Sequence, residues 1–189
     1  TAPVPKAGID GSIDLAGGYY HMCALSVAGE VRCWGYNEFG QLGSGALGLR
    51  TATPTLVANL AAGVKQISAG NEYTCALSAQ NTVFCWGRNT SGSLGNGATT
   101  PSVTPVQVAN LTGIKQISAG GAHACAITAQ DTVVCWGNNS FGQLGNGNRN
   151  NSSTPVAVPN LTGVKSITAG NGHTCAITAQ DTAVCWGWN

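Results

Sequence analysis

Cysteine is the residue type whose number and spacing in this sequence point most clearly to chemistry. Eight cysteines form four pairs, and nine residues separate the two members of each pair. Metal binding is the rival interpretation, but zinc sites usually group cysteines roughly two to four residues apart. The spacing instead predicts four local disulfides, formed in an oxidising compartment outside the cell or at its surface. The predicted bridges are Cys23–Cys33, Cys75–Cys85, Cys125–Cys135 and Cys175–Cys185.

Histidine is the second candidate for chemistry. His21, His123 and His173 each stand two residues before a cysteine, and Tyr73 occupies that place in the remaining case. A cluster of histidines could bind a metal ion. Positions related by repetition are, however, spread across a repeat structure, and tyrosine replaces histidine at one of them. Structural hydrogen bonding is therefore the favoured role, and we predict no metal site.

The acidic residues do not suggest a catalytic centre. The chain has seven of them, and no close pair indicates glycoside hydrolysis. Neither a Gly-x-Ser-x-Gly motif nor a phosphate-binding loop occurs in the sequence. Asp131 and Asp181 fall at equivalent turns, where Asn81 serves in another copy, as expected of turn residues. We predict no catalytic residue, no cofactor site and no enzyme activity.

Composition narrows the class of partner. Only 8% of the residues are charged and the formal net charge is +1, so the chain is not expected to bind nucleic acid. No apolar run approaches the roughly 20 residues that span a bilayer, so membrane insertion is not expected. The 27 glycines indicate tight turns between short strands rather than helices. Thr1 is compatible with a mature N-terminus from which a signal peptide was removed.

The elements that carry these residues are repeated. From Lys65, Lys115 and Lys165 the chain reads KQISAGNEYTCALSAQNTVFCWG, KQISAGGAHACAITAQDTVVCWG and KSITAGNGHTCAITAQDTAVCWG. A more divergent copy precedes them, and the period of 50 to 52 residues falls in the range of propeller blades. Residues 1–189 are interpreted as one repeat domain with units at about 11–64, 65–114, 115–164 and 165–189.

Within a unit the apolar pattern has the period of a strand. Reflecting the segment about Gln80 pairs Cys75 with Cys85 and Leu77 with Val83, which places them on one face of a hairpin. The other face carries Phe84 and a tryptophan, so neither face is polar. Such a sheet must be covered on both sides, which predicts an all-β fold of stacked propeller-type blades. The repeated tryptophans are expected in the core between blades: Trp34, Trp86, Trp136 and Trp186.

Three stretches of one unit resemble a known repeat. Ala119–His123, Val134–Asn139 and Phe141–Gly145 are similar to the repeat of the regulator of chromosome condensation (RCC1-like) family. The resemblance covers nearly the whole chain and implies a β-propeller, typically of seven four-stranded blades, that presents loops to other proteins. Family functions include guanine-nucleotide exchange, chromatin contact, regulation of partner proteins and, in bacteria, secreted inhibition of hydrolases. The paired cysteines, the lack of a basic tail or exchange wedge, and the four units depart from that pattern.

The two ends of the chain resemble parts of one blade. Aligning Gly11 with Gly163 places Pro3 on Pro155, so residues 1–10 resemble the strand that the last unit lacks. Four blades at a seven-fold step of roughly 50° sweep only about 200°. Strand exchange between two copies, head-to-tail growth into a filament, a re-splayed four-bladed ring and a fragment of a longer propeller all remain open. Candidate self-association residues are Thr1, Pro3, Val4, Pro5, Trp186 and Trp188.

The functional expectation follows from these features. The chain is interpreted as a secreted, non-catalytic structural or protein-interaction module that self-associates through incomplete terminal blades. A propeller that binds or inhibits a foreign extracellular protein is the alternative, and guanine-nucleotide exchange is disfavoured by the disulfides. Asn110 and Asn160 are possible glycosylation sites because they occupy equivalent turns; Asn89, Asn138, Asn150 and Asn151 also match the sequon.

Overall fold

The computed structural model describes residues 5–60 and 63–188, and those residues contain strands and turns but no helix. Blade A consists of β1 (Ser12–Gly17), β2 (His21–Ser26), β3 (Val31–Tyr36) and β4 (Arg50–Leu56). Blade B consists of β5 (Val64–Ala69), β6 (Tyr73–Ser78), β7 (Val83–Gly87) and β8 (Ser102–Gln107). Blade C consists of β9 (Ile114–Ala119), β10 (His123–Thr128), β11 (Val133–Gly137) and β12 (Ser152–Ala157). Blade D consists of β13 (Val164–Ala169), β14 (His173–Thr178) and β15 (Ala183–Gly187).

Each blade is an antiparallel sheet whose strands pair in chain order. Blades A, B and C have four strands, and blade D has three among the residues described. The predicted hairpin register is confirmed, with Cys75 opposite Cys85 and Leu77 opposite Val83. The turn before β7 places Asn81 at a φ of 60°, a left-handed conformation that Asn and Asp tolerate better than most residues. Asp131 and Asp181 take the same conformation in blades C and D, as their turn role predicts.

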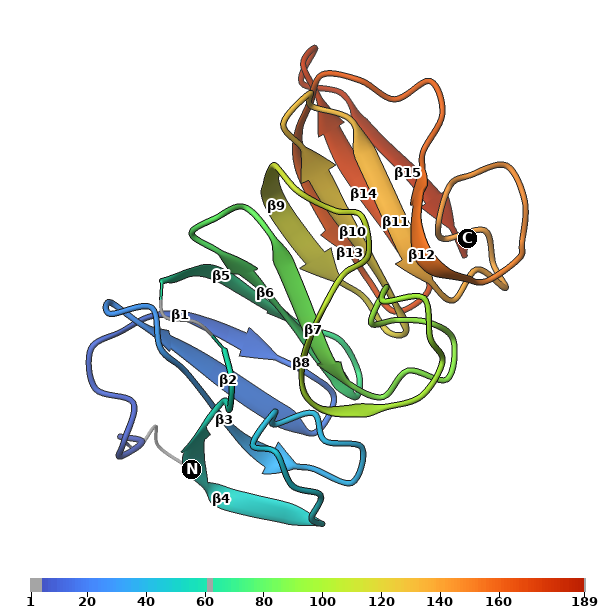
Figure 1. Cartoon of the computed structure of the whole chain (residues 1–189). Helices are drawn as coiled ribbons and strands as arrows, with labels where there is room; N and C mark the ends of the chain where they lie inside the picture. Colours follow the sequence, from blue (N-terminus) through green and yellow to red (C-terminus); the bar gives the residue numbers. More distant parts are fainter. Residues whose placement is uncertain (1–4, 61–62, 189) are drawn as a thin grey trace.

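The four blades follow one another in a row, from blade A at the lower left of Figure 1 to blade D at the upper right. One apolar cluster lies between each successive pair of blades. Between A and B, Leu25 and Cys33 of blade A pack with Ile67 and Trp86 of blade B. Every blade therefore has a cysteine face, which points to the next blade, and a tryptophan face, which points to the preceding one.

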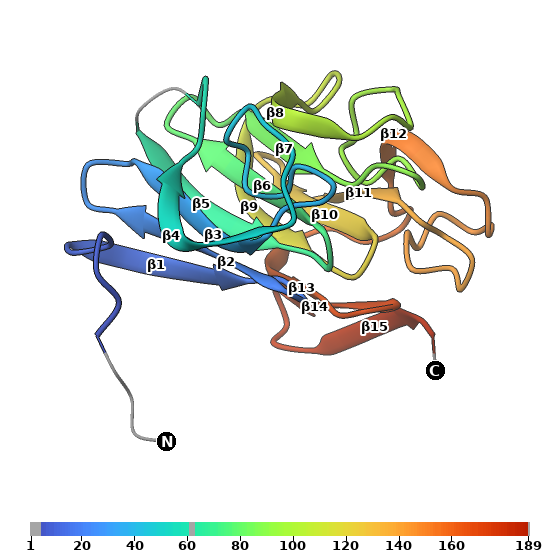
Figure 2. The same ribbon diagram turned by 90° about the horizontal axis from the view of Figure 1, so that it is seen from below.

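The row of blades does not close into a ring. Blade A and blade D lie at its two ends, and no sheet of the described residues covers the tryptophan face of A or the cysteine face of D (Figure 2). The fold is a partial propeller, and the re-splayed four-bladed ring is not the form the chain adopts. The segment before β1 lies against blade A, where Lys6 donates a hydrogen bond to the carbonyl of Ala52. Thr1, Pro3 and Val4 fall outside the described residues, and Pro5 is exposed.

Candidate interaction surfaces

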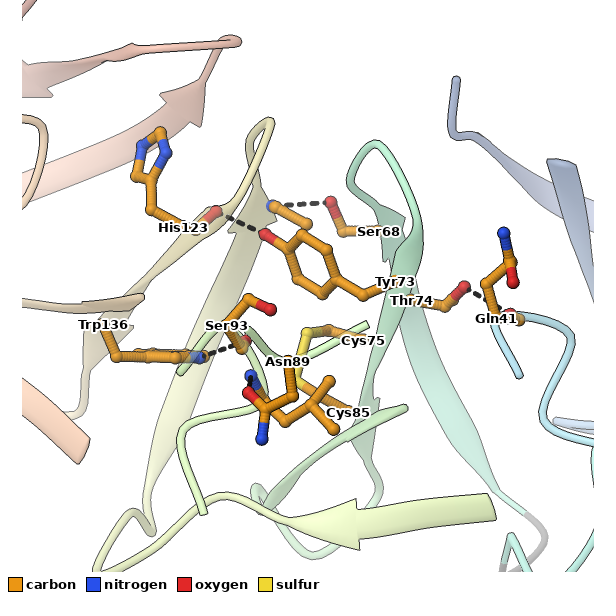
Figure 3. The surroundings of a disulfide bond; sticks show 12 residues. Gln41, Ser68, Tyr73, Thr74, Cys75, Cys85, Asn89, Ser93, His123 and Trp136 are labelled. Atoms are coloured by element: carbon orange, nitrogen blue, oxygen red, sulfur yellow. Dashed lines mark hydrogen bonds between the residues drawn. A yellow bond between two sulfur atoms is a disulfide. The ribbon is translucent and has the colours of Figure 1, made fainter. Parts of the chain in front are cut away.

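The tryptophan indoles anchor the interfaces between blades. Trp86 donates from Nε1 to the carbonyl of Gln41 at 3.0 Å, and Trp136 donates to the carbonyl of Ser93 at 2.9 Å. Both acceptors lie in the loop that follows the third strand of the preceding blade. Trp86 and Trp136 are fully buried, so their predicted place in the core between blades is confirmed. Figure 3 shows Trp136 pointing at Ser93 beside the Cys75–Cys85 bridge.

Side chains of the inner strands also cross from blade to blade. The Gln66 side chain of β5 donates to the carbonyl of Ile117 and accepts from the Ile117 amide, each at 3.0 Å. Ser68 accepts from the Ala119 amide at 2.9 Å. Blade C repeats the two amide contacts on blade D through Gln116 and Ser118. These bonds fix the position of each inner strand along the inner strand of the next blade.

Two histidines are buried between blades and make the predicted structural hydrogen bonds. His21 Nε2 lies 2.8 Å from Thr74 Oγ1, and His123 Nε2 lies 2.9 Å from Thr174 Oγ1. Burial lowers the pKa of His21 and of His123 to about 4, with the charge of His173 as a second cause for His123. Both rings are therefore neutral at pH 7. Within residues 5–60 and 63–188 no group of three metal-ligating side chains is present.

The structure contains all four of the disulfides predicted from spacing, each joining the two middle strands of its own blade. Because the cysteines lie on the cysteine face, the bridges of blades A, B and C are covered by the following blade. Cys125 and Cys135 are 0% exposed under blade D. In blade D, which has no following blade in the described chain, Cys175 is half-buried and Cys185 is exposed. The same covalent feature is thus buried three times and open once.

The tryptophan face of blade A is open. Leu15 stands at the position of the buried Ile67 of blade B, yet it is 56% exposed. Ile13 is 65% exposed, but it falls at the bulge of β1, where blades B, C and D carry the exposed Lys65, Lys115 and Lys165. Trp34 is only half-buried, which departs from its predicted place in the core, because no blade of the described chain packs on that side. A groove of about 780 Å³ runs along this face, lined by Lys6, Tyr20, Trp34, Gly35, Tyr36, Arg50, Thr51 and Ala52.

The cysteine face of blade D is open in the same way. Ile177 is 37% exposed, whereas its equivalent Ile127 is 2% exposed between blades C and D. Ala183 is exposed where blade C carries the buried Val133. The row of blades therefore presents one open tryptophan face and one open cysteine face, the two kinds of surface that pack against each other three times within it.

The two C-terminal tryptophans are used inside the chain. Trp186 faces blade C and donates from Nε1 to the carbonyl of Gln143 at 2.9 Å. Trp188 stacks on Phe141 of the blade C loop, with ring centroids 4.9 Å apart. Of the self-association residues expected from the sequence, these two contact blade C rather than the open face of blade D. The residues on the two open faces that matter, Leu15 and Ile177, look from the sequence like ordinary core residues.

The sequons differ sharply in exposure. Asn110 and Asn160 are exposed at equivalent turns, with φ of 52° and 60°. Asn89 is 0% exposed because its side chain accepts from the Leu94 amide and donates to loop carbonyls. Asn139 organises the next loop in the same way. Sequence reasoning did not assign this role, although both asparagines directly follow a Trp-Gly-x motif.

Comparison with known proteins agrees with this architecture. A family model described as the RCC1-like domain matches residues 2–189. The chain belongs to the RCC1-like domain family. In sequence it is similar to human HERC4, a probable E3 ubiquitin-protein ligase, with 42% identity over 85 residues that make up 44% of this chain and 8% of that protein. It is 40% identical over 84 residues to the ultraviolet-B receptor UVR8 of Arabidopsis thaliana, covering 44% of this chain and 19% of the receptor.

Two solved structures extend the similarity to the whole fold. Human WBSCR16 superposes with a TM-score of 0.83 at 25% identity, over 95% of this chain and 48% of that one. The ectodomain of the Physcomitrella patens receptor kinase CR4 gives a TM-score of 0.62 at 30% identity, over 100% of this chain and 44% of the ectodomain chain. The chain thus spans less than half the length of these relatives. Membership of the RCC1-like family indicates a protein-interaction module.

Proposed function

We propose that the chain is a secreted, non-catalytic module whose copies associate head to tail, the cysteine face of blade D packing on the tryptophan face of blade A in the next copy. One observation supports this most directly. Those two kinds of face already pack together at the A–B, B–C and C–D interfaces, and each end of the row leaves one of them open. An interface between two different faces is heterologous, so repetition gives either a closed ring or a filament.

Exposed apolar side chains favour association at both faces. Leu15 is 56% exposed on blade A and Ile177 is 37% exposed on blade D, whereas their equivalents Ile67 and Ile127 are 4% and 2% exposed. Exposed apolar patches of this kind are typical of interaction sites. Backbone pairing adds a second contribution in the proposal, because no strand pairs with the outer edge of β15 in the described part of blade D. The N-terminal residues of the next copy would add that strand, as an extended segment adds to an open sheet edge.

Strand exchange would also uncover Trp34. In the isolated chain Lys6 lies over the Trp34 ring, with Nζ 5.7 Å from the ring centroid. If residues 1–5 joined blade D of another copy, Lys6 would move off the indole. The indole face would then be free to contact the cysteine face of that copy. Lys6 therefore covers the Trp34 indole in the isolated chain, and in the proposed assembly the residues before it would supply the missing strand.

The disulfides and one structural relative support an extracellular setting. Intracellular compartments keep most thiols reduced, whereas disulfides persist outside the cell or at its surface. The receptor-kinase structure at 30% identity is an ectodomain by its own description. Titration of free thiols in the native material tests this part of the proposal. Eight protected cysteines are expected, and eight free thiols would contradict secretion.

Charged substitutions on the two faces test head-to-tail association. Leu15→Glu blocks the tryptophan face of blade A, and Ile177→Glu blocks the cysteine face of blade D. In sedimentation velocity each variant alone is expected to be a monomer, because every possible contact then includes one blocked face. Mixing the two variants restores one good contact and is expected to give a dimer and nothing larger. Val27→Glu, at a 78% exposed turn away from both faces, is the matched control and should behave as the natural chain does.

Two results would contradict the proposal. Either variant alone could keep the mass of the natural chain, or the mixture could remain monomeric while the natural chain associates. Deleting residues 1–5 tests the strand-exchange part separately. The deletion should weaken association markedly, and an unchanged mass distribution would remove that part while leaving the face-to-face contact.

Binding of a foreign extracellular protein is the second candidate, and one feature favours it. Tyr19 and Tyr20 are 67% and 63% exposed in blade A, where the equivalent positions of blade B carry Asn71 and Glu72. Exposed tyrosines are enriched in protein interfaces. Affinity capture from secretions separates the two candidates. A stoichiometric foreign partner that is lost in a Tyr19→Ser, Tyr20→Ser variant supports this one, and capture of the chain's own copies alone supports self-association.

A further inference from the structure

The three internal interfaces each contain one matched pair of side chains. The first member stands two residues before the first cysteine of a blade, and the second stands directly before the first cysteine of the next blade. Two of the pairs, His21–Thr74 and His123–Thr174, are joined by hydrogen bonds, and the third, Tyr73–Ala124, lies in the apolar cluster between blades B and C. All six residues are buried, with exposed fractions of 0 to 2%.

The His–Thr pair is a defined hydrogen-bond relay. Thr74 Oγ1 donates to the carbonyl of Gln41 at 3.0 Å, so it must accept from His21 Nε2. Thr174 makes the same bond to the carbonyl of Gln143 at 2.9 Å and accepts from His123. The relay thus needs a hydroxyl on the tryptophan face of the following blade, and it holds the imidazole as the neutral Nε2–H tautomer.

The Tyr–Ala pair occupies the equivalent positions at the interface between blades B and C and makes a different contact. Tyr73 is longer than histidine and reaches past its partner to donate from its hydroxyl to the backbone carbonyl of His123 (Figure 3). Ala124 leaves room for the ring and contributes no polar group. The large Tyr73 is thus paired with the small Ala124, whereas each of the two buried histidines is paired with a threonine hydroxyl. The residue before the first cysteine therefore follows the identity of its partner in the preceding blade.

The two open faces carry the unpaired members of this series. His173 lies on blade D, and Met22 occupies the matching position of blade A. Head-to-tail contact would bring them together. Met is larger than Thr or Ala, has no donor and is only a weak acceptor, so it satisfies neither solution. His173 would then be covered without the His–Thr hydrogen bond that His21 and His123 make.

Resting on the proposed head-to-tail association, we infer that the His173–Met22 pair is the specificity-determining contact between copies. It makes that contact weaker than the internal interfaces. It also means that the cysteine face of blade D prefers an RCC1-like blade with Thr directly before its first cysteine over the natural blade A. Association between copies is consequently weaker than it would be with Thr at position 22.

Met22→Thr and Met22→Val test this inference as a matched pair, because Thr and Val have nearly the same shape and only Thr has a hydroxyl. The dissociation constant between copies is measured by sedimentation equilibrium for each variant. Met22→Thr is expected to bind about three- to tenfold more tightly than Met22→Val, the effect of one net hydrogen bond. Adding His173→Phe to both variants should abolish that difference, since the ring then has no donor to pair with the hydroxyl.

The outcomes separate the inference from the proposed function. If copies associate but the Thr and Val variants have equal dissociation constants, the inference is overturned and the proposed function stands. The inference is also overturned if the Thr advantage persists when His173→Phe is present in both variants. If no variant associates at any concentration, both the inference and the proposed function are overturned. Thermal unfolding at low concentration shows whether the Thr and Val variants fold equally well.

Discussion

The interior interfaces and the two open faces use equivalent positions of the repeat and differ in how far those positions are buried. Ile127 is 2% exposed and Ile177 is 37% exposed, although both stand at one repeat position. Trp136 is fully buried between blades, while Trp34 at the equivalent position is half-buried. Burial in this fold is therefore set by the neighbouring blade and not by the repeat itself.

The difference also has an energetic consequence. Full burial of an Ile or Leu side chain is worth about 1.5–3 kcal/mol relative to exposure. Leu15 and Ile177 leave part of that stabilisation unrealised in the isolated chain, because each face lacks its partner. Stacked repeats behave as a sum of unit stabilities and nearest-neighbour interfaces. Each open face is therefore one missing interface term, which another blade can supply.

The largest predicted effect compares two equivalent tryptophans. Trp136→Ala is expected to lower the free energy of unfolding by about 3–5 kcal/mol, since it removes a buried ring and leaves the Ser93 carbonyl without its donor. Trp34→Ala should cost less than half as much, because its ring is already half exposed. Denaturant unfolding measured at low concentration checks both values. Equal losses would break the distinction between interior and open faces.

Acid is expected to destabilise the interface between blades C and D through His123. Between pH 6.5 and about 4 the unfolded chain binds a proton at His123 that the folded chain does not, because burial lowers the folded pKa to about 4. The contribution of His123 to the free energy of unfolding should therefore be constant above about pH 6.5. It should fall as the pH drops from 6.5 to about 4. The share of His123 is about 3 kcal/mol at most.

Unfolding curves of the natural chain and of His123→Phe across that pH range check this prediction. The phenylalanine variant should show a shallower dependence on pH, whatever its stability at neutral pH. Parallel curves would mean that His123 is not held neutral between blades C and D. Thr174→Val is the matched control. It removes the hydroxyl that is hydrogen-bonded to His123 and leaves the titrating ring of His123 in place.

Sequence reasoning reached the repeat, the hairpin register and the disulfides because these depend on residues close together in the chain. The pairing of Cys75 with Cys85 follows from a two-residue period and a local turn. The exposure of Trp34 and Cys185 could not be derived in this way, since each looks identical to its buried equivalents. Exposure depends on whether another blade follows or precedes, and a repeat pattern alone does not reveal that.

The relay between His21 and Thr74 was predicted only in part. The histidines were assigned a structural hydrogen bond, but the partner lies 53 residues away in the next blade. Reading positions 74, 124 and 174 against the preceding histidine or tyrosine would have found the matched pairs. The role of Asn89 and Asn139 as loop organisers follows from bonds to residues up to 11 positions further on, although their repeated place after Trp-Gly-x was visible in the sequence.

The smallest predicted effect concerns two exposed ion pairs, one in an interior blade and one in the terminal blade. Lys115 pairs with Asp131 in an interior blade at 2.6 Å, and Lys165 pairs with Asp181 in the terminal blade at 2.7 Å. Both pairs are exposed at the rim, so Asp→Asn at either place should change the free energy of unfolding by less than about 0.5 kcal/mol. Thermal unfolding checks this. A much larger loss in blade D than in blade C would show that the open face weakens the whole terminal blade.

Reduction of the blade D disulfide tests the central claim most directly. The rate at which a soluble thiol reduces Cys175–Cys185 is followed by alkylation and mass spectrometry over a range of protein concentrations, with the buried Cys125–Cys135 bridge as internal reference. At low concentration Cys175–Cys185 should be reduced well before the reference bridge, because Cys185 is exposed. As the concentration rises the rate should fall, since the tryptophan face of another copy covers the bridge. A rate that is independent of concentration while the chains associate would contradict head-to-tail packing through this face.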